Sequence, residues 1–372
     1  MIKHRNNPIF VGGEVFRKPA FGSNHPLAYS RISGVLDVCE SLGWLPSDLF
    51  CDVEMAPIET LTRLHDSNYI AALQAAVERG SATPDDRARY NFGTMENPVF
   101  PGLFERAATT VAGTIKAAEL ALRHGVAFHP SGGTHHGKPD RAHGFCYFND
   151  PAYGVLSFLD AGVGPVLYLD VDAHHGDGVQ DFFEGDERVW TLSIHEADRW
   201  PHTGPMDDRG QGRAINIPVE RGCNDLEYAL MMNELVYPLI ERMGFQAAVI
   251  TCGADALDAD PLSAMKLSNT TLWNAVEGVI SRVPHVAVLG GGGYNPWTTV
   301  RCWAGLWGRL CGFDMPAQLP DDVVALFQSL DSDLVDEDER EALWFTRLDD
   351  ELSDEKVRPS VRDMVAQMKE IC

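Results

Sequence analysis

Short apolar runs alternate with longer amphipathic stretches along most of this chain. The runs hold four to eight residues and end in polar ones, whereas the longer stretches repeat their apolar positions every three to four residues, as helices do. The pattern predicts six strands, over Val126–His129, Pro165–Asp172, Arg188–His195, Ala214–Val219, Ala247–Cys252 and His285–Leu289. It predicts helices over Phe104–Arg123, Pro151–Asp160, Asp225–Met243, Ser268–Arg282 and Thr298–Leu310.

Buried strands that alternate with helices predict an α/β fold, a parallel sheet with helices on both faces. We expect one domain over residues 1–372, with a motif-bearing core over 25–310 and an acidic, helical C-terminal segment over 321–372. In such sheets the reactive groups gather at the carboxyl ends of the strands. Polar clusters follow five of the predicted strands, at His135-His136, Asp170–Asp177, His195, Asp255 and Gly290–Tyr294.

Composition narrows the class of protein. A hydrophobic content of 45% and a charged content of 23% are those of a folded soluble chain. No run of about eighteen apolar residues and no secretory signal appear, so we expect a cytoplasmic protein without a membrane segment. The net charge of −24 argues against direct binding to nucleic acid. It favours cationic substrates through steering, or serves solubility alone. The eight cysteines form no C-x-x-C pair and are expected as reduced thiols.

The strongest chemical signal is the acidic and histidine-rich stretch from Asp170 to Gly178. Because side chains alternate along a strand, Asp170, Asp172 and His174 are expected on one face, where carboxylate and imidazole can share a metal. The alternative is a buried aspartate that pairs with histidine or caps the next helix. A further ligand is expected from another strand end, and Asp255 stands closest to one. Asp258 and Asp260 are the rival acids, with turn or capping roles as their simpler interpretation.

Two loops rich in glycine carry the remaining chemistry. His135 and His136 follow a Gly-rich turn and are suited to proton transfer, with Asp170 and Asp177 as expected carboxylate partners; the simpler alternative is a pair of surface or capping histidines. Four glycines precede Tyr294, whose hydroxyl could donate to a developing oxyanion. A phosphate cradle is the alternative for this loop, but the sequence lacks the usual phosphate-loop and dinucleotide patterns.

Taken together, these motifs resemble the zinc-dependent histone deacetylase family, including its bacterial acetoin-utilisation and acetylpolyamine amidohydrolase members. The similarity spans about His25 to Leu310. It rests on segments that occur in the family's order: Gly132 to His136, Gly144 to Asp150, Asp170 to Gly178, Gly253 to Asp255 and Gly290 to Tyr294. It implies an arginase–deacetylase fold, a single-domain α/β structure around a central eight-stranded parallel sheet.

The resemblance also implies roles for individual residues. Asp172, His174 and Asp255 would bind one Zn²⁺, or Fe²⁺ in its place. His136, oriented by Asp177, would be the general base and later protonate the leaving amine, and His135, paired with Asp170, would act mainly electrostatically. Tyr294 would donate to the carbonyl oxygen as its charge develops. A structural K⁺ would lie among Asp170, Asp172, His174, Ser193 and Ile194, held partly by their backbone carbonyls.

For the substrate, the resemblance implies aromatic walls at Phe145 and Trp200 and an acceptor at the Gly144 carbonyl. Further substrate-binding candidates are Gly292, Glu96 and Leu262, and Arg31 would lie near a channel for the product. Glu96 stands where class I members place an aspartate that grips the substrate backbone, and its longer side chain departs from that pattern. His143, before Gly144, is unusual in the family. Leu262 stands where polyamine-selective members can carry a glutamate, so it disfavours that selectivity.

The expected function is a zinc-dependent amidohydrolase, a hydrolase of linear amide C–N bonds that removes acetyl or other acyl groups from lysine-like amines. Its expected partner is an acylated lysine peptide or protein, or a small acylated amine; a homo-oligomer is left open. Alternatives are an acetylpolyamine or other small-amide amidohydrolase and a non-catalytic acyl-lysine binder. A dinuclear arginase-like site is disfavoured because Gly176 and Leu257 replace the acids that it would need.

Overall fold

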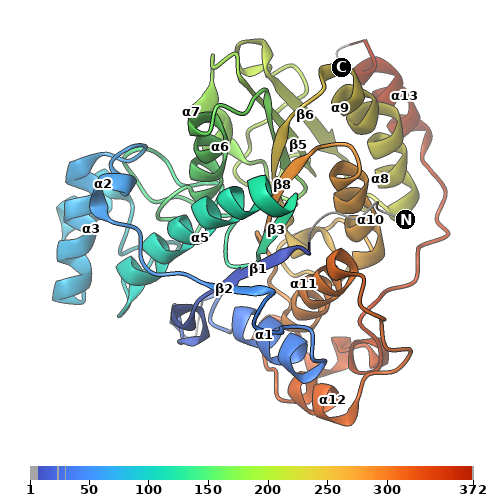
Figure 1. Cartoon of the computed structure of the whole chain (residues 1–372), viewed down its shortest axis with the longest axis horizontal. Helices are drawn as coiled ribbons and strands as arrows, with labels where there is room; N and C mark the ends of the chain where they lie inside the picture. The colour runs from blue at the N-terminus through green and yellow to red at the C-terminus, as the bar shows by residue number, and fades with distance from the viewer. Residues whose placement is uncertain (1–6, 23–24, 30, 371–372) are drawn as a thin grey trace.

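One all-parallel sheet of eight strands organises the chain (Figure 1). The computed structural model describes residues 7–22, 25–29 and 31–370. The strand order is β2-β1-β3-β8-β7-β4-β5-β6, and every neighbouring pair is parallel. The strands are β1 (Ile9–Gly12), β2 (Phe50–Asp52), β3 (Val126–His129), β4 (Val166–Asp170), β5 (Val189–Glu196), β6 (Ala214–Val219), β7 (Ala247–Thr251) and β8 (His285–Leu289). The predicted parallel α/β class and the eight strands implied by the resemblance are confirmed.

All six strands predicted from the pattern are present, and β3, β6 and β8 have the predicted bounds. The pattern missed β1 and β2, which hold only four and three residues. The prediction was also wrong in placing Asp172 inside a strand. β4 ends at Asp170, whose Oδ1 accepts the Asp172 backbone N–H at 3.1 Å; this local bond turns the chain out of the sheet. His195, predicted at the very end of a strand, lies inside β5, which ends one residue later at Glu196.

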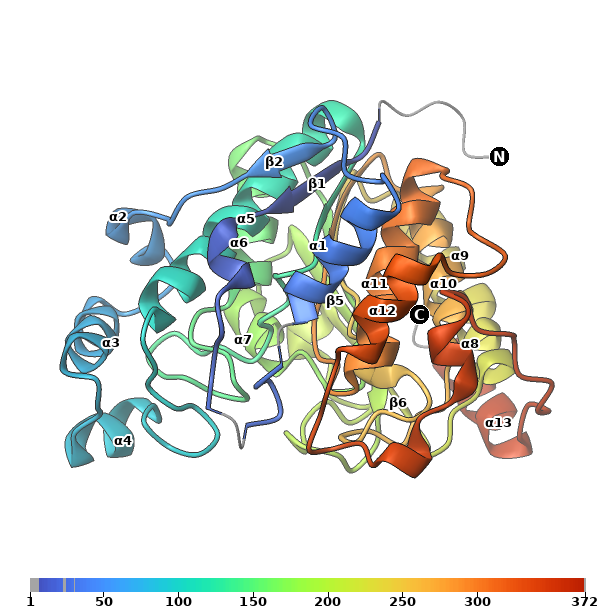
Figure 2. The same cartoon turned by 90° about the horizontal axis from the view of Figure 1, so that it is seen from below.

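Helices cover both faces of the sheet (Figure 2). One face carries α5 (Leu103–His124), α6 (Asp150–Asp160) and α7 (Asp177–Phe183). The other face carries α1 (Arg31–Ser41), α8 (Asp225–Met231), α9 (Tyr237–Met243), α10 (Asn269–Ile280) and α11 (Pro296–Cys311). Successive strand residues alternate between the two hydrophobic clusters: Val249 packs with α6, whereas Ile250 packs with the opposite helices. Because side chains alternate along each strand, every strand contributes to the hydrophobic clusters on both faces of the sheet.

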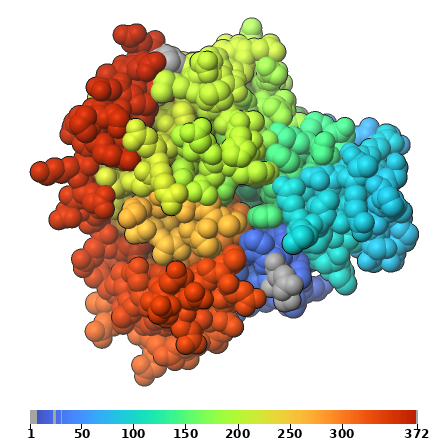
Figure 3. Space-filling model, turned by 180° about the vertical axis from the view of Figure 1, so that it is seen from behind, coloured from blue at the N-terminus to red at the C-terminus, as the bar shows by residue number. Residues whose placement is uncertain are grey.

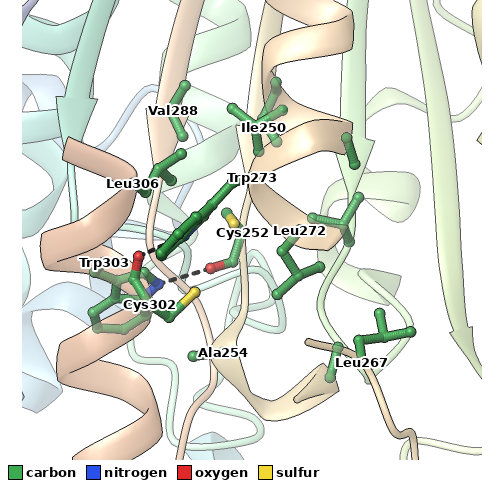
Figure 4. Close-up of a cluster of buried hydrophobic side chains, with 14 of the residues drawn as sticks. Ile250, Cys252, Ala254, Leu267, Leu272, Trp273, Val288, Cys302, Trp303 and Leu306 are labelled. Carbon is green, nitrogen blue, oxygen red and sulfur yellow. Dashed lines mark hydrogen bonds between the residues drawn. The ribbon is translucent and has the colours of Figure 1, made fainter. Parts of the chain in front are cut away.

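Two tryptophans pack the helices α10 and α11 against the sheet (Figure 4). Trp273 of α10 and Trp303 of α11 are fully buried beside Ile250 and Val288. Their indole N–H groups donate to the carbonyls of Cys302 and Cys252, at 2.8 and 2.9 Å. The second bond fixes α11 against the end of β7, where the loop to Asp255 begins, because an unsatisfied buried indole would be costly.

A small helical lobe and the C-terminal segment complete the chain. The lobe holds α2 (Ile58–Leu61), α3 (Ser67–Arg79) and α4 (Pro84–Tyr90), which the pattern did not predict, and Tyr69 of α3 packs on Phe148. Within the described helices, none combines the length and apolar content needed to cross a bilayer. Seven cysteines have free thiols; Cys372 lies outside the described residues.

Two helix predictions need correction. The helix predicted over Asp225–Met243 contains a π-helical segment, Met232–Val236, between α8 and α9. The C-terminal segment is only partly helical, with α12 (Asp321–Gln328), α13 (Pro359–Met368) and two short 3₁₀ turns, Glu337–Glu339 and Ala342–Phe345. The stretch between the helices is held instead by side chains of the core. Buried Arg301, for example, donates to the carbonyls of Arg347 and Asp349, so this backbone needs no helix to satisfy those groups.

The carboxyl ends of the strands lie at the lower edge in Figure 2 and on the face turned toward the viewer in Figure 3. Segments far apart in sequence meet there: the cyan lobe, the yellow-green chain near residues 200–220 and the gold chain near residue 260 (Figure 3). The polar clusters that follow the strands therefore come together on one face, as the sequence predicts for a parallel sheet.

Candidate active site

Asp172, His174 and Asp255 converge just beyond β4 and β7. His174 Nδ1 lies 2.9 Å from Asp255 Oδ2 and 3.2 Å from Asp172 Oδ1. Each residue offers one ligand atom, and these atoms lie within 4.8 Å of one another. Both carboxylates are fully buried, and His174 is 8% exposed. The loops, and not strand alternation, bring these three groups together.

Glycine backbone lies close to the two carboxylates, and backbone N–H groups orient them. A Cβ on Gly253 would overlap Asp172 Oδ2, and a Cβ on Gly292 would overlap Asp255 Oδ2. The Gly292 N–H donates to Asp172 Oδ2 at 2.6 Å, and the Ala173 N–H donates to Asp255 Oδ1 at 3.0 Å. The second oxygen of each carboxylate is thereby left toward His174.

The electrostatics of these groups also favour a cation. Burial, together with the charge of Asp172, raises the pKa of Asp255 to about 6. Against burial, hydrogen bonds to Asp172 and Asp255 raise the pKa of His174 to about 10. Two buried carboxylates that repel each other are costly without a positive partner. One imidazole and two carboxylates are a donor set that Zn²⁺ accepts, so the residues fit a divalent cation.

His135 and His136 each contact a separate carboxylate. His135 Nδ1 lies 2.6 Å from Asp170 Oδ2, and His136 Nδ1 lies 2.7 Å from Asp177 Oδ1. Burial opposes protonation of both rings. For His135 the charges of Asp170 and its neighbours outweigh burial and raise the pKa to about 9. For His136 burial and the adjacent His135 lower the pKa to about 3. The two rings therefore differ: burial and His135 favour a neutral His136 ring, whereas the neighbouring carboxylates favour charge on His135.

Asp177 has a second partner that the motifs did not indicate. Lys138 Nζ lies 2.5 Å from Asp177 Oδ2, and His143 Nδ1 lies 3.5 Å from the same oxygen. Burial opposes ionisation, but the bonds to His136 and Lys138 lower the pKa of Asp177 well below its usual range. Asp177 is thus an anion fixed between a lysine and a histidine, able to orient the His136 ring.

A cavity of about 800 Å³ opens beside these groups. His136 meets Trp200 edge-on with ring centroids 4.6 Å apart, and Phe145 and Tyr294 are 6.0 Å apart. The candidate site residues that line it are Glu96, His136, Gly144, Phe145, His174, Trp200, Leu262 and Tyr294. Segments spread over about two hundred positions of the sequence thus build one pocket.

The other candidates lie elsewhere. Gly292 contacts the carboxylate of Asp172 and does not line the cavity. Arg31 borders a second cavity of about 100 Å³ and donates to the Gly291 carbonyl at 2.8 Å, which supports the glycine loop. Ser193 pairs in register with Asp170 across β4 and β5, one residue before Ile194.

Two buried aspartates hold the site without entering it. Asp260, a rival metal ligand in the sequence, instead accepts the backbone N–H groups of Tyr294 and Leu262, at 2.7 and 2.9 Å. Asp150 accepts the N–H groups of Gly133 and Thr134, at 3.0 and 2.7 Å, and so fixes the turn that leads to His135. Asp150 lies inside one of the quoted motifs, which was the only sequence signal for it.

Comparison of the chain with known proteins identifies its family. A profile of the histone deacetylase domain matches residues 25–310. The chain belongs to the histone deacetylase family. Histone deacetylase 8 of Xenopus tropicalis is 30% identical over 299 residues, which is 78% of this chain and 80% of that protein. The acetoin utilization protein AcuC of Bacillus subtilis (strain 168) is 30% identical over 337 residues, 86% of each chain.

Solved structures agree with the sequence comparison. A histone deacetylase homologue from Aquifex aeolicus superposes with a TM-score of 0.92 at 30% identity, covering 98% of this chain and all of that one. A homologue in complex with SAHA superposes with a TM-score of 0.91 at 31% identity and the same coverage. The predicted resemblance is confirmed, and the protein is a hydrolase of the deacetylase type.

Proposed function

We propose that this deacetylase uses Zn²⁺ and removes acyl groups from lysine-like amines. The observation that supports this most is a single cavity bordered by His174, His136 and Tyr294: a ligand of the metal group, a neutral base and a hydroxyl donor. Those are the three functions that amide hydrolysis needs at neutral pH.

Asp172, His174 and Asp255 would hold the ion, with Fe²⁺ as the alternative. When bound there, such an ion polarises a carbonyl and lowers the pKa of a water molecule. The protein's own part is to keep the two carboxylates ionised and aimed, through Gly292 N–H and Ala173 N–H. The K⁺ expected among Asp170, Asp172, His174, Ser193 and Ile194 belongs to the same proposal.

Proton transfer falls to His136. Its Nδ1–H donates to Asp177, so its Nε2 is left to take the proton of the attacking water and to return it to the departing amine. Asp177 fixes this tautomer. His135, held by Asp170 and charged, adds positive potential beside the developing anion.

The substrate would lie between Phe145 and Trp200, with its carbonyl oxygen toward the Tyr294 hydroxyl. Burial, with the negative charge of Asp255, raises the pKa of Tyr294 well above its usual range, so the hydroxyl keeps the proton that it must donate. The acyl product would leave toward the second cavity, where Arg31 can pair with a carboxylate.

An acylated lysine side chain is the substrate that we favour. Leu262 lines the cavity and offers no charge to a second amine, which is why an acylated polyamine is the second candidate. The single-domain organisation over residues 1–372 belongs to the same proposal, because Phe327 and Met368 of the C-terminal helices pack in the same cluster as the sheet. Location in the cytoplasm, absence of nucleic-acid binding and the oligomeric state stay predictions of the sequence.

Amine release from a matched panel tests the proposal. Zinc-loaded protein would be offered an acetyl-lysine peptide, the same peptide with a longer acyl chain, and acetylspermidine. We expect turnover of a peptide; its acyl preference then sets the chain length. Preference for acetylspermidine would overturn the choice of lysine. Inactivity toward all three, with zinc bound, would overturn the substrate class.

A further inference from the structure

The wall residue Phe145 sits in a tight two-residue turn. The His143 N–H donates to the Cys146 carbonyl at 3.0 Å, and the Cys146 N–H returns the bond at 2.9 Å. Between them Gly144 has φ 53° and Phe145 has φ 66°. Positive φ at both central positions is the signature of a primed hairpin turn, which favours Asn-Gly or Gly-Gly. Phenylalanine pays a steric cost in this conformation, so the turn needs support from outside.

Two consecutive residues of a distant loop supply that support. The Gly144 N–H donates to Glu96 Oε1 at 3.1 Å, and the Phe145 N–H donates to Asn97 Oδ1 at 2.9 Å. Both central amides of the turn are thus paired with side chains of residues 96 and 97. Neither amide could be satisfied within a two-residue turn.

The rest of the Glu96 carboxylate is also engaged. Its Oε2 accepts the side-chain amides of Asn91 and Asn97, both at 3.2 Å. Asn97 is fully buried, so it cannot swing away to release Glu96. Both carboxylate oxygens therefore have protein donors, although the residue lines the cavity.

The turn that Glu96 holds is in contact with the reacting groups. A Cβ on Gly144 would overlap the Trp200 ring and come within 2.7 Å of His136 Cδ2. The bare backbone of Gly144 thus packs against the other wall and against the base. A shift of this backbone would move Phe145, Trp200 and His136 together.

We propose that Glu96 and Asn97 are positioning residues for the Gly144–Phe145 turn, and that Glu96 does not bind the peptide backbone of the substrate. This inference rests on the proposed function and changes the role that the family resemblance implies for Glu96. Recognition then depends on the acylated amine and its stem. The N–H groups of the residues flanking the acyl-lysine contribute little to binding.

Kinetics with two substrates separate positioning from gripping. The substrates are an acetyl-lysine peptide and its depsipeptide, in which esters replace the two amides that flank the acetyl-lysine, so that the N–H groups are lost without added bulk. Wild-type protein should show the same KM for both. A KM several-fold higher for the depsipeptide would overturn the proposal.

Variants at Glu96 supply the second comparison. Glu96→Ala should lower kcat about ten-fold or more for both substrates, because the turn loosens, with little change in KM. Glu96→Gln should restore part of kcat, since its carbonyl oxygen can still accept the Gly144 N–H while its amide cannot accept from Asn91 and Asn97. Met95→Ala is the matched control: Met95 is 92% exposed on the same loop and should change neither parameter. A rise in KM confined to the peptide, with kcat kept, would mean that Glu96 grips the substrate.

Hydrogen exchange provides a readout that needs no turnover. The Gly144 and Phe145 amides should exchange slowly in the wild type and about ten-fold faster in Glu96→Ala, as expected for a lost hydrogen bond, with distant amides and thermal unfolding unchanged. Slow exchange in a wild type that is inactive on every substrate would refute the proposed function and leave the positioning role standing. Equal exchange in the wild type and Glu96→Ala would refute the positioning role.

Discussion

The backbone amide of Tyr294 donates to the buried carboxylate of Asp260 across 2.7 Å. The other oxygen of Asp260 accepts the Leu262 N–H at 2.9 Å, so one aspartate ties the glycine loop to the cavity wall. Asn295 adds a parallel bond, from its side-chain amide to the Ala259 carbonyl at 3.0 Å. The position of the Tyr294 hydroxyl is therefore set by a residue thirty-four positions away.

Removal of that tie should misplace Tyr294. Asp260→Ala is expected to lower kcat by about 10- to 100-fold, because an error of about 1 Å in a catalytic group costs that much. If the effect passes through Tyr294, Asp260→Ala combined with Tyr294→Phe should be scarcely slower than Tyr294→Phe alone. Steady-state kinetics of the three variants check this. Fully additive losses would show that Asp260 acts by another route.

Tyr294 itself should matter only once charge develops on the carbonyl oxygen. Tyr294→Phe removes one hydroxyl and is expected to lower kcat by about two to three orders of magnitude. KM and metal content should hardly change, because the ring and the metal group stay in place. An unaltered kcat would refute the role of oxyanion donor.

The cluster of Asp172, His174 and Asp255 predicts the metal content of the protein. We expect one divalent ion per wild-type chain after dialysis and none in His174→Ala, measured by elemental analysis, because two carboxylates alone hold a catalytic ion poorly. His202→Ala, which removes another histidine of the same cavity, should keep its ion. Full occupancy in His174→Ala would remove that residue from the ligand set.

The anion at Asp177 should govern the base. Asp177→Asn keeps the shape but not the charge, and it turns an amide toward Lys138. We expect a fall in kcat of about 100-fold or more, the scale of lost general-base catalysis. Asp181→Asn is the control, because Asp181 contacts the same lysine at 2.7 Å and is largely exposed. Equal rates for both variants and the wild type would contradict the assignment.

Buried His65 gives the fold a defined response to pH. Its Nε2 accepts the Asn149 N–H at 3.1 Å, and its Nδ1 lies 2.9 Å from the Lys138 carbonyl, so the ring is neutral. Burial lowers its pKa to about 4, whereas the unfolded chain has a histidine pKa near ~6.5. Between these values the unfolded state binds the extra proton. The contribution of neutral His65 to the free energy of unfolding is therefore complete above pH ~6.5 and is lost as pH falls.

Urea unfolding at several pH values between about 4 and 7 measures this loss. One such histidine lowers the free energy of unfolding by at most ~1.4 kcal/mol per pH unit. His65→Gln should flatten the slope by up to that amount in this window. His202→Gln, at an exposed histidine, is the matched control. Identical slopes in His65→Gln and the wild type would show that His65 takes up its proton in the folded state.

Local patterns predicted the sheet well because buried strands are short, continuous apolar runs in the sequence. Val126–His129 and His285–Leu289 are continuous apolar runs, and the structure reproduces their bounds. The same reasoning failed for β2, where Phe50 and Cys51 are half-buried and Asp52 is exposed at the edge of the sheet. It also extended β4 to Asp172, because no period shows that a side chain, Asp170, captures the next turn.

In the site, the sequence named residues but not their partners. His135 and Asp170 stand in separate motifs, and their bond could be anticipated only because both lie at the carboxyl edge of one sheet. Lys138 was missed, since a lysine two residues after His136 carries no signal of its own. For Glu96, family position indicated a substrate contact, and only the folded loop shows that both of its carboxylate oxygens also have protein donors.

What the sequence by itself determined is whatever its local order encodes: strands alternating with helices, hence a parallel sheet, and short motifs specific enough to identify the deacetylase family. What only the tertiary structure decided is which polar groups meet. The loop at Glu96 meets the turn at Phe145, and Asp260 meets Tyr294, across gaps of dozens of residues. Such contacts depend on how helices and loops pack against the sheet. A hydrogen bond tolerates only tenths of an ångström, and no periodicity along the chain specifies that.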